Sequence, residues 1–302
     1  MTGLHKYLLL FTAALLLGAA LVVWFYPSNT NFSVDNSEWN GTRRLVEKYQ
    51  IRALDSLSRL PAEPEETALL LVPYLVFTDG ELDKLERYLN NGGTLIIADD
   101  YGHGNEVLAY LDVKARFTGV NLVDPLSRQN SPLFPVITHF NDHVFTEGVE
   151  RLVMNHPAGL SNIGEDEALA YSSLFSFLDM EGNGVKDEED GAGPLPVMAK
   201  IQRGQGRLVL ISDPSIFINS MLETGGNQTL LENFSALAVR GMYIDQSHIA
   251  ESNLEQAKGI LKKARSLLGS SAGLLLLVAV FAALLPLYLR GQQLEQERRK
   301  FD

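Results

Sequence analysis

Two long apolar runs that carry no charge constrain this chain more than any other feature of its sequence. They are YLLLFTAALLLGAALVVWFY, at residues 7–26, and LLGSSAGLLLLVAVFAALLPLYL, at residues 267–289. Each has about 20 residues, the length that a helix needs to cross a bilayer. We therefore expect two transmembrane helices, an N-terminal anchor within residues 1–27 and a second at 267–289, with a separate domain between them. A cleaved signal peptide is the alternative for the first run, although its apolar stretch is longer than a usual signal core.

The basic residues near the two runs predict the orientation of the chain. No lysine or arginine occurs between the first run and Arg43, whereas the C-terminal tail, residues 290–302, carries four. Because positively charged tails stay in the cytoplasm, we expect both termini there, the domain outside, and the lipid bilayer as one partner. An amphipathic stalk helix is expected at residues 247–266. It departs from the charge rule, since its basic side chains would lie outside and face anionic headgroups; they are Lys258, Lys262, Lys263 and Arg265.

The segment between the two runs is acidic. Residues 28–258 hold 17 lysines and arginines against 34 aspartates and glutamates, a net charge of −17. We therefore expect no nucleic acid partner, because phosphate binding needs a basic face. The chain has no cysteine, and an exported domain without disulfides is typical of a prokaryotic surface.

Buried strands and amphipathic helices alternate along residues 28–246, the expected extracytoplasmic domain. TALLLVPYLVF (67–77) and TLIIADD (94–100) are continuous apolar runs, as in strands that are buried on both faces. The helix between them is capped by a Thr-Asp pair and ends at a Gly-Gly pair. GRLVLISDPSIF and NQTLLENFSALAV repeat the strand and the helix later in the chain. This alternation predicts an α/β fold with a mostly parallel sheet and flanking helices, of the flavodoxin-like kind. The polar segment 27–40 has no period and is interpreted as a linker.

Three stretches of the domain resemble a known family. They are ADDYGHGNEVLAYL after the second strand, GPLPVMAKIQRGQGRLVLISDPSIFIN after an acidic loop, and GNQTLLENF at the start of the last helix. With an anchor on each side, residues 32–290 resemble the prokaryotic membrane-anchored family of domain of unknown function 4350. The resemblance implies a fold like that of class I glutamine amidotransferases and gene neighbours that encode a MoxR-type ATPase and a von Willebrand factor A-like protein. It implies no activity, and the cysteine nucleophile of class I amidotransferases is absent from this chain.

The acidic loop, DMEGNGVKDEED at residues 179–190, has the spacing of an EF-hand-type calcium loop. Such a loop places side-chain oxygens at alternate positions, a backbone carbonyl at the seventh, and a glycine at the sharp turn of the sixth. Gly184 stands at the turn, and the ligand positions hold Asp179, Glu181, Asn183, Val185, Asp187 and Asp190. Hard oxygen ligands in this number favour calcium over zinc. We therefore predict a structural calcium ion; a solvated acidic turn is the alternative.

Two loops that come directly after strands carry the residues predicted to bind a ligand. They are DDYGHGNE, at residues 99–106, and SDPSIFIN, at residues 212–219. In open α/β sheets, ligands bind beyond the carboxyl ends of the strands, where both loops should lie. The predicted ligand-binding residues are Asp100, Gly102, His103, Gly104, Asn105, Asp213 and Ser215. The alternative is that both loops are ordinary turns in which these side chains bond to the backbone.

These features predict a membrane-anchored domain without catalytic residues that binds a small polar ligand or a partner protein. A hydrolase is one alternative, in which Ser215 and His103 belong to a triad, or Asp99, Asp100 and His103 act together. The G-x-S-x-G pattern of a nucleophile elbow is absent around Ser215. A subunit of a membrane complex with a MoxR-type ATPase system is the other alternative.

Overall fold

The structure is a computed structural model that describes residues 3–275, 278–279, 281–282, 285–286 and 289–290. The chain divides into two compact units. One is Pro27–Ser252, which contains the sheet, and the other combines the residues before Pro27 with those after Ser252.

The unit formed by the two ends of the chain is helical. It contains α1 (Gly3–Phe25) and α6 (Asn253–Gly269). Among the described residues, only the part of α1 from Tyr7 to Phe25 is long and apolar enough to cross a membrane, so α1 suits either an anchor or a signal sequence. The second predicted transmembrane helix, 267–289, and the predicted tail, 290–302, reach outside the described residues.

The predicted stalk helix begins later than expected, at Asn253 rather than at residue 247. The carboxylate of Asp245 accepts hydrogen bonds from the backbone N–H groups of Ser247 and His248, which form a turn at this point. His248 is buried, so the segment before Asn253 belongs to the larger unit.

An eight-stranded sheet forms the centre of the larger unit, in the order β1-β14-β2-β3-β13-β12-β10-β7. Strands from β1 to β13 in this order are parallel, and those from β13 to β7 are antiparallel. The prediction of an α/β domain with a mostly parallel sheet is confirmed. The strands are β1 (Arg52–Leu54), β14 (Gly241–Asp245), β2 (Thr67–Leu71), β3 (Thr94–Ala98), β13 (Gly206–Ile211), β12 (Pro196–Arg203), β10 (Ala168–Tyr171) and β7 (His139–Phe140).

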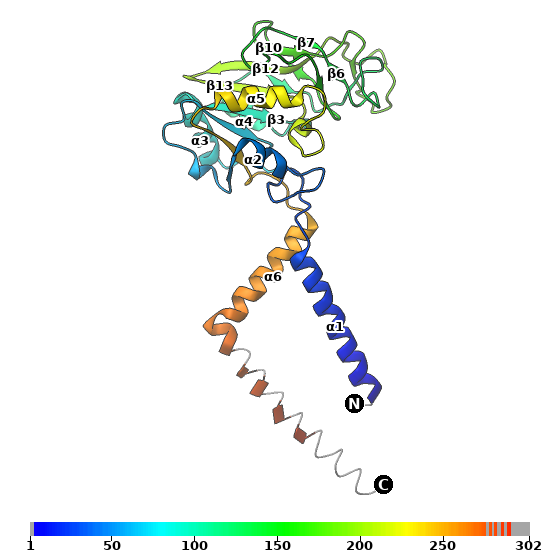
Figure 1. Cartoon of the computed structure of the whole chain (residues 1–302), viewed down its shortest axis with the longest axis vertical. Coiled ribbons are helices and arrows are strands. Elements are labelled where there is room, and N and C mark those ends of the chain that lie inside the picture. Colours follow the sequence, from blue (N-terminus) through cyan, green and yellow to red (C-terminus); the bar gives the residue numbers. More distant parts are fainter. Residues whose placement is uncertain (1–2, 276–277, 280, 283–284, 287–288, 291–302) are drawn as a thin grey trace. The chain divides into compact units, whose positions relative to one another are not determined.

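Helices cover both faces of this sheet, as Figure 1 shows. Leu45 of α2 (Arg43–Tyr49) and Leu230 of α5 (Asn227–Leu237) pack with alternate strand residues in one buried cluster. Leu85 of α3 (Asp79–Asn90) and Val107 of α4 (Asn105–Tyr110) pack with the other strand residues in a second cluster. Because successive strand side chains point to opposite faces, β2 and β3 are buried on both sides, as their apolar runs predicted.

Short strands and turns fill most of the region between α4 and β12. They form three two-stranded sheets outside the central sheet. Their strands are β4 (Arg116–Phe117), β5 (Leu122–Val123), β6 (Val136–Ile137), β8 (Leu152–Val153), β9 (Leu160–Ser161) and β11 (Phe177–Leu178), and the 3-10 turns of the unit are η1 (Leu57–Arg59) and η2 (Pro214–Phe217).

The interpretation of residues 27–40 as a linker is wrong, because this segment packs on the larger unit. Phe32 is only 6% exposed and belongs to one of the two buried clusters. Its carbonyl accepts a hydrogen bond from the Thr42 hydroxyl at 2.9 Å, and the amide of Asn219 donates to the carbonyl of Glu38 at 2.6 Å. Side-chain hydrogen bonds to the backbone therefore hold this segment in place. It has no regular helix or strand, so no periodic sequence pattern predicted its order.

Candidate functional site

The two loops with predicted ligand-binding residues lie side by side at the carboxyl edge of the sheet. β3 and β13 are neighbouring parallel strands, with Ala98 beside Ile211 at their ends. The backbone N–H of Asp99 donates to the carbonyl of Ile211 at 3.0 Å, which holds the two loops together as they leave the sheet. β2 is the next strand along, and the segment after it brings Tyr74 to the same edge.

Asp99 builds the loop after β3. Its two carboxylate oxygens accept hydrogen bonds from the backbone N–H groups of Tyr101, Gly102 and Gly104, at 2.9, 3.1 and 2.6 Å. Burial raises the pKa of Asp99, whereas these three hydrogen bonds lower it. Gly104 is required, because a Cβ there would lie 2.9 Å from Ile97. Asp99 is therefore structural, and the loop leaves the next two side chains facing the edge of the sheet.

Tyr74 is held by the end of β14. Its backbone N–H donates to the carbonyl of His248 at 2.8 Å, and the buried His248 ring bonds through Nδ1 to Asp245 at 2.8 Å. The same ring stacks on Phe77 with centroids 3.9 Å apart. The buried Asp245–His248 pair thus fixes the segment that carries Tyr74 at the edge of the sheet.

A cavity of about 370 Å³ opens at this edge, within the larger unit. Three parallel strands supply part of its wall through the residues that come after them: Tyr74 after β2, Asp100 and Tyr101 after β3, and Ser215 after β13. The other lining residues come from the N-terminal segment and from the loops around β4, β5, β8 and η2; they are Asn31, Phe32, Trp39, Asn40, Gly119, Asn121, Asn155, His156 and Ile218. A pocket of this size suits a small molecule.

Two carboxyl groups with raised pKa values stand at the cavity. Burial, and then the charge of Asp99, raise the pKa of Asp100 to about 7. Asp213 is fully buried at the start of η2, and burial raises its pKa to about 7, with a further rise from the charge of Asp100. Asp213 accepts from the backbone N–H groups of Asn155 and Ser215, both at 2.7 Å, so its oxygens are engaged. Asp100, by contrast, forms no hydrogen bond or ion pair with another described residue.

The structure divides the seven predicted ligand-binding residues into three groups. Asp100 and Ser215 line the cavity. His103 lies close to it, with its ring centroid 6.1 Å from that of Tyr74, but does not line it. The others shape the loops: Gly102 has a φ of +88°, the Asn105 side chain bonds to the backbone N–H and carbonyl of Phe117, and Gly104 and Asp213 make the contacts given above.

Sequence reasoning missed most of the residues that line the cavity. Asn31, Phe32, Trp39 and Asn40 lie in the segment that was interpreted as a linker. The one available signal was the high content of asparagine and aromatic residues in PSNTNFSVDNSEWN, which is unusual for a flexible connection. Asn121, Asn155 and His156 lie in irregular loops, where no local pattern reveals long-range neighbours.

The acidic loop forms a closed turn after β11. The Asp179 carboxylate is buried and accepts from the N–H groups of Asn183 and Gly184, at 3.0 and 2.8 Å. The Asp190 carboxylate accepts from the N–H groups of Met180 and Asp187, at 3.0 and 2.8 Å. Gly184 has the positive φ, +73°, expected of a sharp turn. In the part of the chain that the structure describes, no three acidic or histidine side chains are gathered as metal ligands, so calcium binding stays a prediction.

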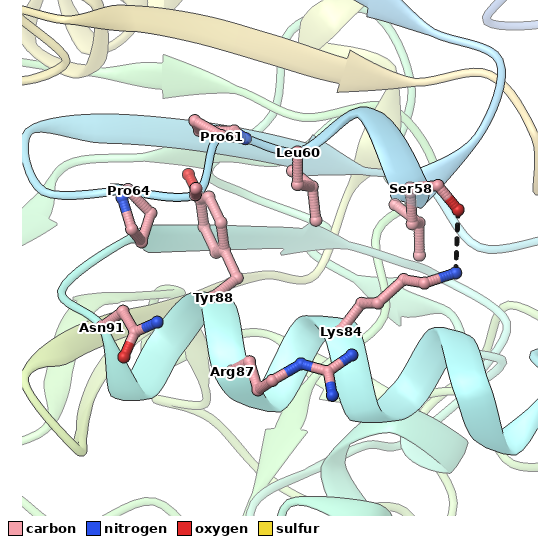
Figure 2. Close-up of a pocket in the computed structure, with 10 residues that line it drawn as sticks. Ser58, Leu60, Pro61, Pro64, Lys84, Arg87, Tyr88 and Asn91 are labelled. Atoms are coloured by element: carbon pink, nitrogen blue, oxygen red, sulfur yellow. Dashed lines mark hydrogen bonds between the residues drawn. The ribbon is translucent and has the colours of Figure 1, made fainter.

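A second hollow, of about 360 Å³, has the opposite electrostatic character. Figure 2 shows it between α3 and the segment from Leu57 to Pro64. Lys84 and Arg87 of α3 line it, and the Lys84 ammonium donates to the Ser58 hydroxyl at 3.0 Å. The remaining walls are largely apolar. No residue of this hollow was singled out from the sequence.

Comparisons with known proteins identify a family and a fold. A family model described as Domain of unknown function (DUF4350) matches residues 34–235. No curated protein matches the chain. Among solved structures, the N-terminal domain of mmIFT52 is similar, with 15% identity, a TM-score of 0.51, and coverage of 70% of this chain and 95% of that one. At this identity the likeness shows the fold alone.

Two other similar structures match less closely. A ThuA-like protein from Parabacteroides merdae has 13% identity and a TM-score of 0.34, over 65% of this chain and 80% of that one. A β-galactosidase from Bacillus circulans has 15% identity and a TM-score of 0.34, over 55% of this chain and 22% of that one. Neither likeness supports an argument about activity.

Proposed function

This chain belongs to the family described as Domain of unknown function (DUF4350), and from the cavity described above we propose that its larger unit binds a small polar ligand at the carboxyl edge of the sheet. The observation that carries the proposal is the Asp100 side chain. It lines the cavity and forms no hydrogen bond with another described residue, whereas its neighbours Asp99 and Asp213 are fully engaged by backbone N–H groups. A partly buried polar group without a protein partner is suited to a ligand.

Binding without chemical transformation is supported by the surroundings of Ser215. Among the described residues, no histidine ring forms a hydrogen bond with its hydroxyl, which bonds instead to the fully buried carboxylate of Asp213; that carboxylate also accepts from two backbone N–H groups. A hydrolase of the Ser-His-Asp type needs a histidine within hydrogen-bond reach of its serine. The hydrolase alternative keeps one point in its favour, the raised pKa values of Asp100 and Asp213, which suit proton transfer near neutral pH. If it holds, Ser215→Ala abolishes turnover of an ester, amide or glycoside.

The proposal keeps the membrane arrangement expected from the sequence. In it, α1 is an uncleaved anchor, residues 267–289 cross the bilayer again, and the larger unit lies outside the cytoplasm. The length of the apolar part of α1 and the basic tail support this arrangement.

We likewise propose kinship with the class I glutamine amidotransferase fold, without its cysteine. A partnership with a MoxR-type ATPase system remains a prediction.

A pocket-filling variant tests the proposed function. Asn121 lines the cavity with an exposed side chain, so Asn121→Trp fills the space without disturbing the core. Asn130→Trp, at an exposed residue that does not line the cavity, is the matched control. The full chain in lipid nanodiscs is screened by thermal shift against sugars, amino acids, organic cations, carboxylates and nucleotides.

We expect at least one class of compound to raise the melting temperature of the wild type and of Asn130→Trp, but not that of Asn121→Trp. The proposal fails if no class produces a shift, or if every shift persists in Asn121→Trp.

A further inference from the structure

We propose that the ligand of the cavity is a neutral saccharide, whose pyranose ring stacks on the aromatic side chains while its hydroxyl groups bond to the carboxyl and amide side chains. This inference deepens the proposed function and rests on it. It comes from the kinds of side chain that the fold gathers at one place.

The aromatic side chains of the cavity offer apolar faces to a ligand. Trp39 and Tyr101 line it and are 65% and 64% exposed. Tyr74 also lines it, with its ring stacked on that of Phe32 at 5.7 Å and 6.2 Å from that of Tyr101. Large aromatic rings exposed beside a hollow are typical of binding sites. One face of a pyranose ring consists of C–H groups, and such a face packs well on an aromatic ring.

The polar side chains of the cavity suit hydroxyl groups. An asparagine amide both donates and accepts hydrogen bonds, as a sugar hydroxyl does. Four asparagines line the cavity, and the side chains of Asn121 and Asn155 form no hydrogen bond with another described residue. Asp100 adds an acceptor that can bridge two neighbouring hydroxyl groups, and Ser215 adds a hydroxyl.

The charges at the cavity disfavour an anion. None of the thirteen described residues that line it is a lysine or an arginine. Asp100 is at its wall and Asp213 lies behind it, so a phosphate or carboxylate would face two carboxyl groups, with no lysine or arginine in the lining to offset its charge. On the same unit, Lys84 and Arg87 line the second hollow instead.

An organic cation is the rival ligand, because aromatic rings and a carboxylate also hold quaternary ammonium groups. A quaternary ammonium group has no acceptor for an amide N–H, so where it packs against the half-buried Asn155 it would leave that amide without a partner. The amides therefore favour a saccharide over a cation. A volume of about 370 Å³ is near the lower end of ligand pockets, which fits one or two sugar rings.

Calorimetry on the full chain tests the proposal, in lipid nanodiscs because many detergents carry sugar headgroups. The titrants are the methyl pyranosides of glucose, galactose and mannose, with glucose 6-phosphate and choline as charged comparisons. We expect at least one methyl pyranoside to bind, and glucose 6-phosphate to bind more weakly than its neutral counterpart. Loss of a hydrogen-bond acceptor or of a stacked ring should raise the Kd at least about tenfold in Asp100→Ala and Tyr101→Ala.

Matched variants separate binding from folding. Tyr101→Phe keeps the ring and should retain most of the affinity that Tyr101→Ala loses. Arg87→Ala, in the second hollow, should leave the affinity for the pyranoside unchanged. Binding of a pyranoside that survives both Asn121→Trp and Tyr101→Ala would overturn the saccharide assignment.

The outcomes also separate this inference from the function on which it rests. Suppose that no pyranoside binds, but that choline or a compound of another class binds to the wild type and not to Asn121→Trp. The saccharide assignment is then wrong and the proposed binding function stands. If no compound of any class binds, both fail.

Discussion

The surroundings of Asp100 and Asp213 raise the pKa values of these two side chains at the cavity. Both come after parallel strands, where backbone N–H groups and helix starts usually stabilise a carboxylate. Asp99 accepts from the N–H groups of the loop after β3, and Asp100 is left partly buried beside that charge. Its pKa therefore rises instead of falling, and the cavity holds a carboxyl group that titrates near neutral pH.

This shift predicts that the larger unit loses stability as the pH rises. An aspartate in the unfolded chain has a pKa of about 3.9, whereas Asp100 and Asp213 have values of about 7 in the fold. The folded state thus holds protons more tightly, and its stability falls from about pH 4 to about pH 7. We expect a lower melting temperature at pH 8 than at pH 5, measured by circular dichroism. Asp100→Asn should raise the value at pH 8 and reduce the difference.

Asp166→Asn is the control for this measurement, since Asp166 is exposed and does not line the cavity. It should leave the pH dependence unchanged. An equal effect of the two substitutions would mean that general charge repulsion in the acidic unit, and not the position of Asp100, causes the loss.

Individual elements vary in how far their own sequence predicts them. The helix α3 was expected with nearly its observed bounds, because a Thr-Asp pair caps its start, a Gly-Gly pair ends it, and its leucines share one face. The structure adds a capping box between Thr78 and Glu81. The buried runs at β2 and β3 were equally clear. The N-terminal segment was not, because its order comes from hydrogen bonds between residues that are far apart in the chain, such as Asn219 and Glu38.

The same limit applies to the candidate site. Asp100 and Ser215 could be placed at the carboxyl edge, because a parallel sheet brings strand ends together. The partners of Asp213 could not, since Asn155 reaches it from an irregular loop. Local sequence patterns predict which residues follow the end of a strand. They do not predict which distant loops pack against that end.

The helix α5 is fixed to β8 by one side chain. Asn227 is fully buried; its amide oxygen accepts from the N–H of Val153 at 3.0 Å, and its NH₂ group donates to the carbonyls of Val153 and Met221. Asn227→Ala leaves these backbone groups buried without partners, which should cost about 3 kcal/mol of unfolding free energy. Urea denaturation measures this cost. Gln228→Ala, which loses only an exposed bond to Glu232, should stay within about 0.5 kcal/mol of the wild type.

The acidic loop, residues 179–190, is the second element with a direct test. If it binds calcium as its spacing predicts, calorimetry with CaCl₂ on the full chain shows one site, and Asp179→Ala removes it. Asp166→Asn serves again as the control. Binding that is unchanged in Asp179→Ala would place the ion elsewhere, and no binding at all would leave a turn closed by its own hydrogen bonds.

At the scale of the whole molecule, the proposed topology can be tested with single cysteines, because the chain has none of its own. A cysteine at the exposed Glu165 should react with a membrane-impermeant maleimide on intact cells. A cysteine at Gln293, in the basic tail, should react only after lysis. The reverse pattern would place the larger unit in the cytoplasm, and labelling of both on intact cells would exclude a two-pass arrangement with a cytoplasmic tail.

The central claim is that ligand binding occurs at the carboxyl edge of the sheet, and hydrogen–deuterium exchange of the full chain tests it most directly. The compound with the largest thermal shift is added, and backbone exchange is measured along the chain by mass spectrometry. The account predicts slower exchange in 30–41, 73–77, 99–105 and 213–218, the segments that surround the cavity. Protection confined to 57–64 and 84–91, around the basic hollow, would contradict it.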